Sequence, residues 1–181
     1  EADISNARIC STKLCNADLT KADLSGSKLH NSDLTAAFLT RGNFSDAELI
    51  CGKLVGACLQ DAVLIRAKLL EANLRATNFT GACIKNWQID SSTIFSGTQC
   101  EYVFRDFNSE TKKFSGRLPI DKSIVFAPNE FEQWAKVRER ALETIDLTFT
   151  EGIDWQAFFE SFREVCDNRP SESIAVRSME S

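Results

Sequence analysis

Apolar residues recur at every fifth position through the first half of the chain. From Ile4 to Ile94, nineteen consecutive positions at this spacing hold Ile, Leu or Phe; Gln99 then interrupts the column and Phe104 restores it. Two places earlier runs a second column of small residues, mostly Ala, Ser and Gly. A period of five is that of neither an α-helix nor a plain β-strand, but it suits a short strand followed by a corner. The pattern therefore predicts a solenoid in which each unit of five residues forms one side of a coil.

Strand alternation sets the inside of this predicted solenoid. It points the small and the large residue of each unit inward, and the two neighbours of the large residue outward. Trp87 and Tyr102 occupy the small column, which predicts either bulged strands there or rings turned outward toward the C-terminal segment. The positions expected to form the core are Leu24, Leu34, Phe44, Leu54, Leu64, Leu74 and Phe79.

Several of the units carry one recognisable motif. Ala17-Asp18-Leu19, Ala22-Asp23-Leu24, Ser32-Asp33-Leu34 and Ala72-Asn73-Leu74 are near copies of A(D/N)LXX. This motif resembles that of the pentapeptide-repeat family, and the resemblance covers the repeat region. It implies an all-β solenoid, a right-handed quadrilateral β-helix with four units per coil, in which residues twenty apart stack. With twenty residues per coil the repeats would make about five coils, stacked about 4.8 Å apart.

The residues after the repeats predict an α-helical hairpin that caps the solenoid. The expected divisions are a β-helix at 1–107, a loop or tether at 108–128, a helical hairpin at 129–170 and a disordered tail at 171–181. Asn129, with a Glu at the third helical position, is the expected N-cap of the first helix. A cap is expected because the terminal coils of such a stack are otherwise uncovered. The predicted cap residues are Trp87, Phe131, Trp134, Trp155, Phe158 and Phe162. The alternative interpretation of these aromatic residues is a groove for a partner.

Charge narrows the range of partners. The chain has 181 residues and a formal net charge of −5, but residues 1–107 hold twelve acidic and eleven basic side chains and are nearly neutral. Some pentapeptide-repeat proteins bind a type II topoisomerase (gyrase) by imitating DNA, and the resemblance to such mimics implies a strongly acidic surface. A nearly neutral surface is a poor copy of a phosphate backbone. It also lacks the basic stripe of a nucleic-acid binder, so no nucleic-acid partner is expected.

Cysteine usage and the absence of targeting patterns suggest a location. No run is long and apolar enough for a membrane span, and no signal peptide is predicted at the start. The seven cysteines lack C-x-x-C spacing, which favours reduced thiols and a cytoplasmic protein. A disulfide across a corner or to Cys166 stays open, as does a removed upstream segment.

No catalytic, cofactor or metal site is predicted. His30 is the only histidine, and with Cys10 one coil below it would supply two metal ligands, whereas a structural zinc site needs four. No serine lies in a nucleophile motif beside a histidine base, and no glycine-rich phosphate loop is present. The sequence therefore favours a protein that is not an enzyme.

Outward apolar residues in the middle coils suggest how the protein acts. In consecutive coils they would form one patch, and a patch of this kind marks an interaction site. Its expected members are Ile50, Val55, Val63, Ile65 and Leu70. The hypothesis is a protein-interaction scaffold with a protein partner; the alternatives are a gyrase-binding DNA mimic and a structural module of a longer protein. The first coil should present an open edge, covered by upstream residues or by another molecule, so that a homo-oligomer could form there.

Overall fold

The computed structural model describes residues 2–111 and 113–140, which belong to one compact unit, Glu1–Glu143. Three of the predicted cap residues, Trp155, Phe158 and Phe162, lie outside the described residues. So do the predicted second helix, the tail at 171–181 and Cys166.

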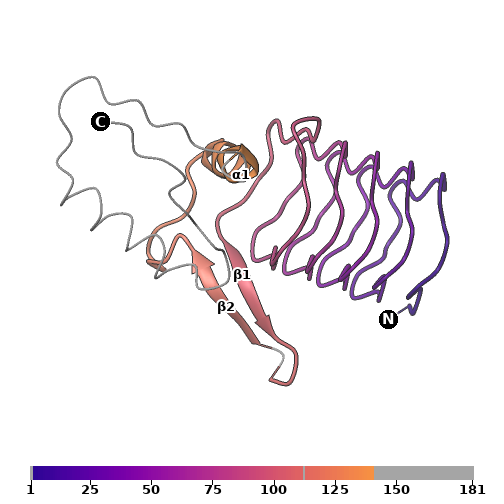
Figure 1. Ribbon diagram of the computed structural model, residues 1–181, viewed down its shortest axis with the longest axis horizontal. Helices are drawn as coiled ribbons and strands as arrows, with labels where there is room; N and C mark the ends of the chain where they lie inside the picture. The colour runs from indigo at the N-terminus through magenta and orange to yellow at the C-terminus, as the bar shows by residue number, and fades with distance from the viewer. Residues whose placement is uncertain (1, 112, 141–181) are drawn as a thin grey trace, which may run out of the picture. The chain divides into compact units, whose positions relative to one another are not determined.

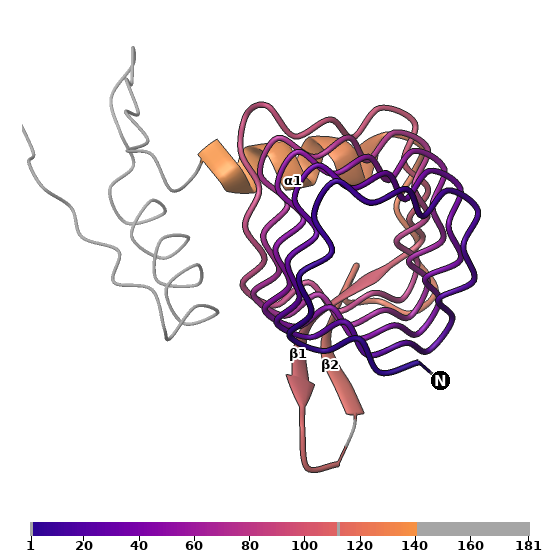
Figure 2. The same cartoon turned by 90° about the vertical axis from the view of Figure 1, so that its right-hand side faces the viewer.

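The repeats form stacked coils, seen from the side in Figure 1 and along their axis in Figure 2. Parallel bridges join residues twenty apart, from Asp3↔Asp23 through Lys68↔Gln88. Four units of five residues therefore complete one turn of the chain, and each unit forms one of four sides. The backbone ladder is continuous: the Leu24 N–H donates to the Asn43 carbonyl at 2.8 Å, and this pattern repeats unit after unit.

Each side ends in a tight turn that the sequence motif encodes. The second residue after the large one has a positive φ, as at Asn6 with 55°, and the next N–H closes the turn, as from Ala7 to the Ile4 carbonyl at 3.3 Å. A positive φ at this position is the signature of a type II turn. The Asp or Asn of the motif braces the turn, since Asp23 Oδ1 accepts the N–H of Ser25 at 2.9 Å.

The large column is the core. Leu54 has no exposed surface, and its coil is bridged to those of Leu34 and Leu74, which are equally buried. Burial of one such side chain contributes about 1.5–3 kcal/mol to stability. All seven residues expected at the core have zero exposure: Leu24, Leu34, Phe44, Leu54, Leu64, Leu74 and Phe79.

The regular register ends at the corner after Gln88. The next bridges, beginning with Asn73↔Ile94, join residues twenty-one apart, so one extra residue has entered the corner. Asp90 bonds across this wider corner: its carboxylate accepts the hydroxyl of Thr93 at 2.9 Å. The structure thus adjusts the length of the last coil by a single residue.

Because of this extra residue, the large inward residues of the last coil differ from those predicted. The inward position moves from Ile94 to Phe95, which is 1% exposed, because the following turn now closes from Thr98 to the Phe95 carbonyl. Gln99 and Phe104 form the bridges to the previous coil and are not members of the inward column. The predicted interruption at Gln99 and restoration at Phe104 are therefore wrong. Cys100 packs against the core in place of Gln99.

The two aromatic residues of the small column behave differently. Trp87 is 9% exposed and lies on a side whose ladder ends at Gln88, so no coil beyond restricts its ring. After the shift, Tyr102 falls at a corner instead of in the small column. Its ring is half-buried, and the guanidinium of Arg117 lies 4.6 Å from the ring centroid.

A β-hairpin replaces most of the loop expected from residue 108. Strand β1 (Val103–Asn108) continues from the last coil and pairs antiparallel with β2 (Lys113–Leu118). Ring packing supports the hairpin, because Phe114 of β2 stacks on Phe104 at 5.2 Å between centroids. The chain then returns to the coils, where the Phe126 N–H donates to the Glu101 carbonyl at 2.9 Å.

Helix α1 (Glu130–Arg140) follows, and its start differs in detail from the prediction. Asn129 has a positive φ of 67°, and the carboxylate that bonds back to the preceding turn belongs to Glu130, which accepts the Ala127 N–H at 2.7 Å. Glu132 instead pairs with a lysine one turn later. The carboxylate that caps the helix start therefore lies two residues earlier than predicted, at Glu130 instead of Glu132.

An aromatic cluster joins α1 to the last coils. Phe131 is 2% exposed, and its ring lies 5.6 Å from Phe79, 6.3 Å from Trp87 and 6.4 Å from Phe95. Trp134, one turn later, stacks on Phe131 at 5.9 Å. Among the described residues, no helix has the length and apolarity to cross a membrane.

Candidate functional site

The four sides of the coils are the surfaces on offer. In chain order they are side 1, centred on Leu24, side 2 on Leu29, side 3 on Leu34 and side 4 on Leu39. Each side carries two outward rows, one from the residues before the central position and one from the residues after it. Neighbours within a row come from successive coils, about 4.8 Å apart.

Side 2 carries a charged row beside a row with an apolar middle. The charged row of side 2 is Arg8, Lys28, Glu48, Lys68 and Gln88. The second row of side 2 is Cys10, His30, Ile50, Leu70 and Asp90.

The five residues of the expected apolar patch fall on three sides. All five are half-buried. Ile50 and Leu70 are neighbours in the second row of side 2, whereas Val63 and Ile65 belong to side 1 and Val55 to side 3. The structure therefore brings Ile50 and Leu70 together, but it does not merge all five into one surface.

Glu48 organises the charges of side 2. Its carboxylate lies 2.8 Å from His30 Nε2, 3.0 Å from Lys68 Nζ and 3.9 Å from Lys28 Nζ. The hydrogen bonds from Lys68 and then from His30 lower the pKa of Glu48, against the opposing effect of its desolvation. Glu48 is the least exposed of the set, with 20% of its side chain accessible against 55% for Lys28. The cations around it face solvent.

Ion pairs between successive coils neutralise other acidic side chains. Arg66 makes two bonds of 2.7 Å to the carboxylate of Asp46, twenty residues earlier, and these bonds lower the pKa of Asp46. Arg41 lies 3.6 Å from Asp61 in the same relation. Exposed pairs of this kind contribute little stability, about 0–1 kcal/mol each. Their effect on the surface is larger, since paired acids do not add up to an acidic stripe.

Further acidic groups serve the turns. Asp33 accepts the hydroxyl of Thr35 at 2.6 Å and its N–H at 3.1 Å, and these bonds lower the pKa of Asp33. Asp18 does the same with Thr20, through its N–H at 3.0 Å. These carboxylates are part of the corners that carry the fold.

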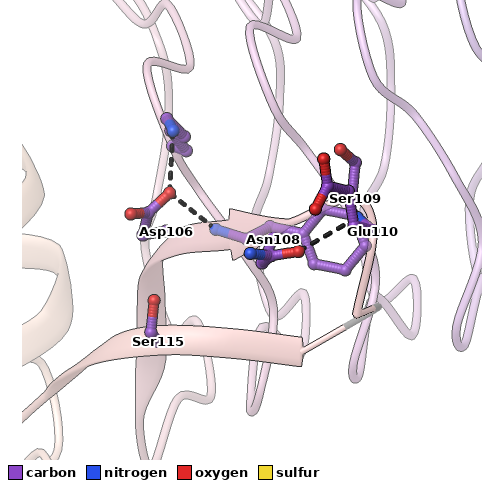
Figure 3. A pocket seen from close by; sticks show the side chains of 7 residues that line it. Asp106, Asn108, Ser109, Glu110 and Ser115 are labelled. Carbon is purple, nitrogen blue, oxygen red and sulfur yellow. Dashed lines mark hydrogen bonds and ion pairs between the residues drawn. The ribbon is translucent and has the colours of Figure 1, made fainter.

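A shallow hollow lies beside the hairpin, with a volume of 440 Å³. Asp106 of β1 bonds to Lys85 at 2.7 Å, and Asn108 accepts the N–H of Glu110 at 3.0 Å, as Figure 3 shows. Ser115 lines the hollow from β2. The carboxylate of Asp106 and the side-chain oxygen of Asn108 are thus engaged by neighbouring groups of the hairpin and the last coil.

His30 contacts the charged row of side 2. The ring meets Glu48 rather than Cys10, whose Sγ donates to the Lys28 carbonyl at 3.5 Å. Within residues 2–111 and 113–140, no group of three potential metal ligands converges. None of the six described cysteines forms a disulfide within those ranges.

Sequence reasoning missed the cluster around Glu48. Its signal was available, because Lys28, Glu48 and Lys68 are spaced by twenty residues and alternate in charge. Once four units per coil are assumed, opposite charges twenty apart are expected to face each other.

Comparison with known proteins adds a family-level match. The family model for pentapeptide repeats matches in eight copies, over residues 2–41, 29–64 and 57–89. A search of curated proteins finds no significant match.

Solved structures of pentapeptide-repeat proteins are similar to the chain. Rfr23 from the cyanobacterium Cyanothece 51142 is 32% identical, with 52% of this chain and 60% of that one covered and a TM-score of 0.43. HetL from Nostoc sp. strain PCC 7120, described as involved in heterocyst differentiation regulation, is 23% identical, with coverages of 63% and 52% and a TM-score of 0.38. The protein alr5209 from Nostoc PCC 7120 is 31% identical, with coverages of 56% and 86% and a TM-score of 0.31. The chain thus spans 60% and 52% of the length of the first two.

Proposed function

Because this chain belongs to the pentapeptide-repeat family, whose members form right-handed quadrilateral β-helices, we propose that it is a non-enzymatic scaffold for protein–protein interaction. The observation that carries this proposal is the pair Ile50 and Leu70, which occupy neighbouring outward positions on side 2. The interior of the coils is filled by the large column, so these two side chains are not needed to build the core. An apolar surface that the core does not use favours a role in contact with another protein.

Rigidity supports the same role. The backbone of each inner coil is bonded on both edges: Glu48 donates to the Ser27 carbonyl at 2.9 Å, and Leu49 to the Lys68 carbonyl at 2.8 Å. Side chains on such a frame keep fixed positions, which lowers the entropy lost when a partner binds. The other apolar residues of the expected patch would extend the contact around the corners to sides 1 and 3.

The alternative of a DNA mimic is less well supported. Such a mimic needs unpaired negative charges at the density of a phosphate backbone. Here Asp46 and Asp61 pair with arginines of the next or the previous coil, and Asp33 is engaged in its own turn. A structural module of a longer protein is the third alternative, and it predicts that Ile50 and Leu70 contact another part of that protein.

The experiment compares one double variant with a matched control. Ile50→Glu with Leu70→Glu should leave the melting temperature nearly unchanged but abolish co-purification of the proteins that the wild-type chain captures from its native cells. The control is Thr40→Glu with Gln60→Glu, which places the same charges in the same row of the opposite side, side 4. Capture that survives the first pair, or that is lost equally with both, contradicts the proposed surface. A fall in melting temperature of many degrees with the first pair alone would show instead that the chain itself covers these residues.

A further inference from the structure

We propose that side 2 binds an acidic amphipathic α-helix of a partner protein, laid along the axis of the coils. This inference rests on the proposed function and specifies the chemistry of the partner. Its contact surface consists of Ile50 and Leu70, with Lys28 and Lys68 in the adjacent row.

The charged row of side 2 has an excess of positive charge. Its charged row holds Arg8, Lys28 and Lys68 against one carboxylate, that of Glu48, which is already engaged by Lys68 and His30. A lysine ammonium has three donors, and Lys68 uses one of them on Glu48. Lys28, at 3.9 Å from Glu48, lies beyond hydrogen-bond distance and is 55% exposed. We therefore expect carboxylates of the partner to accept hydrogen bonds from the remaining N–H donors of Lys28 and Lys68.

Two further acidic residues lie at the end of side 2: Asp90, and the exposed Glu71 at the corner after Leu70, whose carboxylate accepts the Sγ–H of Cys51 at 3.5 Å. Asp90 lies at the end of the second row, where its carboxylate accepts the N–H of Glu71 at 3.0 Å and the hydroxyl of Thr93 at 2.9 Å. The carboxylate of Asp90 is therefore engaged in hydrogen bonds at the corner, one coil beyond Leu70.

A helix fits the spacing of the rows. Neighbours within a row are about 4.8 Å apart, the separation of paired strands. Helical residues three and four apart are separated by about 4.5 and 6.0 Å along the axis, so one apolar residue per turn matches one coil. The two rows lie two residues apart on one strand, about 6.6 Å, which places an acidic stripe beside an apolar stripe on the same helix face.

A strand does not fit this surface. Adding a strand requires free backbone donors and acceptors at a sheet edge. On side 2 the Glu48 N–H and carbonyl are both bonded, to Ser27 and Leu29 of the coil below, and the Leu49 N–H is bonded to the coil above. Only side chains are available, and side chains recognise the face of a helix.

Peptides of about five helical turns provide the probe. One carries a Leu stripe flanked by Glu, the second has Lys in place of Glu, and the third has Gln. Binding to the full chain is followed by fluorescence anisotropy, with a DNA duplex of similar length as a fourth ligand. The Glu peptide should bind with the highest affinity. Raising the salt concentration from about 0.1 M to about 1 M should lower that affinity, since salt screens the attraction between exposed charges.

Substitutions locate the site. The double variant Lys28→Gln with Lys68→Gln should lower the affinity for the Glu peptide by about threefold to tenfold, which is the effect expected from removing two exposed charge pairs. Lys28→Arg with Lys68→Arg should restore binding and shows that the fold tolerates change at these positions. The control, Lys13→Gln with Lys53→Gln, removes two lysines from the corresponding row of side 3 and should have no effect.

Several results would overturn the inference: preferred binding of the Lys peptide or of DNA, no binding of the Glu peptide, or an equal loss with the control pair. The scaffold proposal fails separately. If Ile50→Glu with Leu70→Glu abolishes capture of the native proteins while Lys28→Gln with Lys68→Gln preserves it, the scaffold stands and the acidic helix is wrong. If both double variants preserve capture, both proposals are wrong.

Discussion

The carboxylate of Asp90 accepts the backbone N–H of Glu71 at 3.0 Å. At the equivalent corner one coil earlier, the N–H of Cys51 donates to the backbone carbonyl of Leu70. The extra residue in the last coil displaces the carbonyl that would serve Glu71, and a side chain takes its place. A side-chain oxygen thus maintains the ladder where the backbone cannot.

Removal of this oxygen should destabilise the last coil. Asp90→Ala leaves the N–H of Glu71 without its acceptor, which should lower the free energy of unfolding by about 1–3 kcal/mol. Urea denaturation measures the change, with Ser91→Ala as the control, since Ser91 is exposed at the neighbouring position. If the two variants have the same midpoint, the carboxylate has no role in holding the corner.

Stability should fall in acid. Asp90 has a pKa below its ordinary value because hydrogen bonds from Glu71 and Thr93 outweigh its desolvation, and the pKa values of Asp33 and Asp46 are also lowered. A carboxyl group with a depressed folded-state pKa stabilises the protein above its unfolded value, about 3.9 for Asp. That contribution is lost as pH falls through the folded-state pKa. Urea midpoints should therefore be level near neutrality and drop below about pH 4. A midpoint that stays constant or rises in acid would contradict this sign.

The inward register is tested at two adjacent residues. Leu54→Lys places a charge where no surface is exposed, and should lower the free energy of unfolding by about 3–5 kcal/mol. Lys53→Ala, one position away and exposed, should change it by less than about 0.5 kcal/mol. Thermal melts compare the two, and equal effects would mean that the assignment of inward and outward positions is wrong.

The aromatic cluster should depend on Phe131. Phe131→Ala removes a buried ring that contacts Phe79, Trp87 and Phe95, which should cost about 3–5 kcal/mol. The control is Gln133→Ala, an exposed position on the same helix. Near-UV circular dichroism and the melting temperature report the loss. A variant that melts with the wild type would show that α1 does not stabilise the coils.

Thiol reactivity should follow exposure. In the folded protein a small alkylating reagent should modify Cys15, which is exposed, well before Cys83, which has no exposed surface. After denaturation without reductant, all seven cysteines should react, as expected for a protein of a reducing compartment. Peptide mapping by mass spectrometry follows both stages. Five or fewer reactive thiols in the denatured chain would reveal a disulfide.

The sequence predicts the repeat fold well because one physical constraint acts at every unit. Each large residue must occupy the one position in five that has room for it inside the coil, so Leu54 and its neighbours can be assigned by counting. Asp23 and the other motif carboxylates are equally regular, since each braces the turn beside it.

The shift of register by one residue near Asp90 could not be predicted from the five-residue period. Ile94 and Phe95 are both large and apolar, so either can fill the inward column and the sequence fits two registers. The resolving signal is Gly97, which has a φ of 72° and stands two residues after Phe95, the place of the left-handed corner residue. The hairpin was missed for another reason: its stability depends on Phe114 stacking on Phe104, a contact that composition does not reveal.

The repeat of twenty residues also limits how the length of this chain can vary. A duplication or deletion of twenty residues adds or removes one whole coil and leaves every later row in line with the earlier ones. A change of five residues would keep the core intact yet rotate all later rows by a quarter turn, moving Leu70 off the side that holds Ile50. Such a change would leave the stability of the fold nearly unchanged but would disrupt the surface that binds a partner. Length variants in multiples of five therefore separate the demands of folding from those of binding more cleanly than single substitutions do.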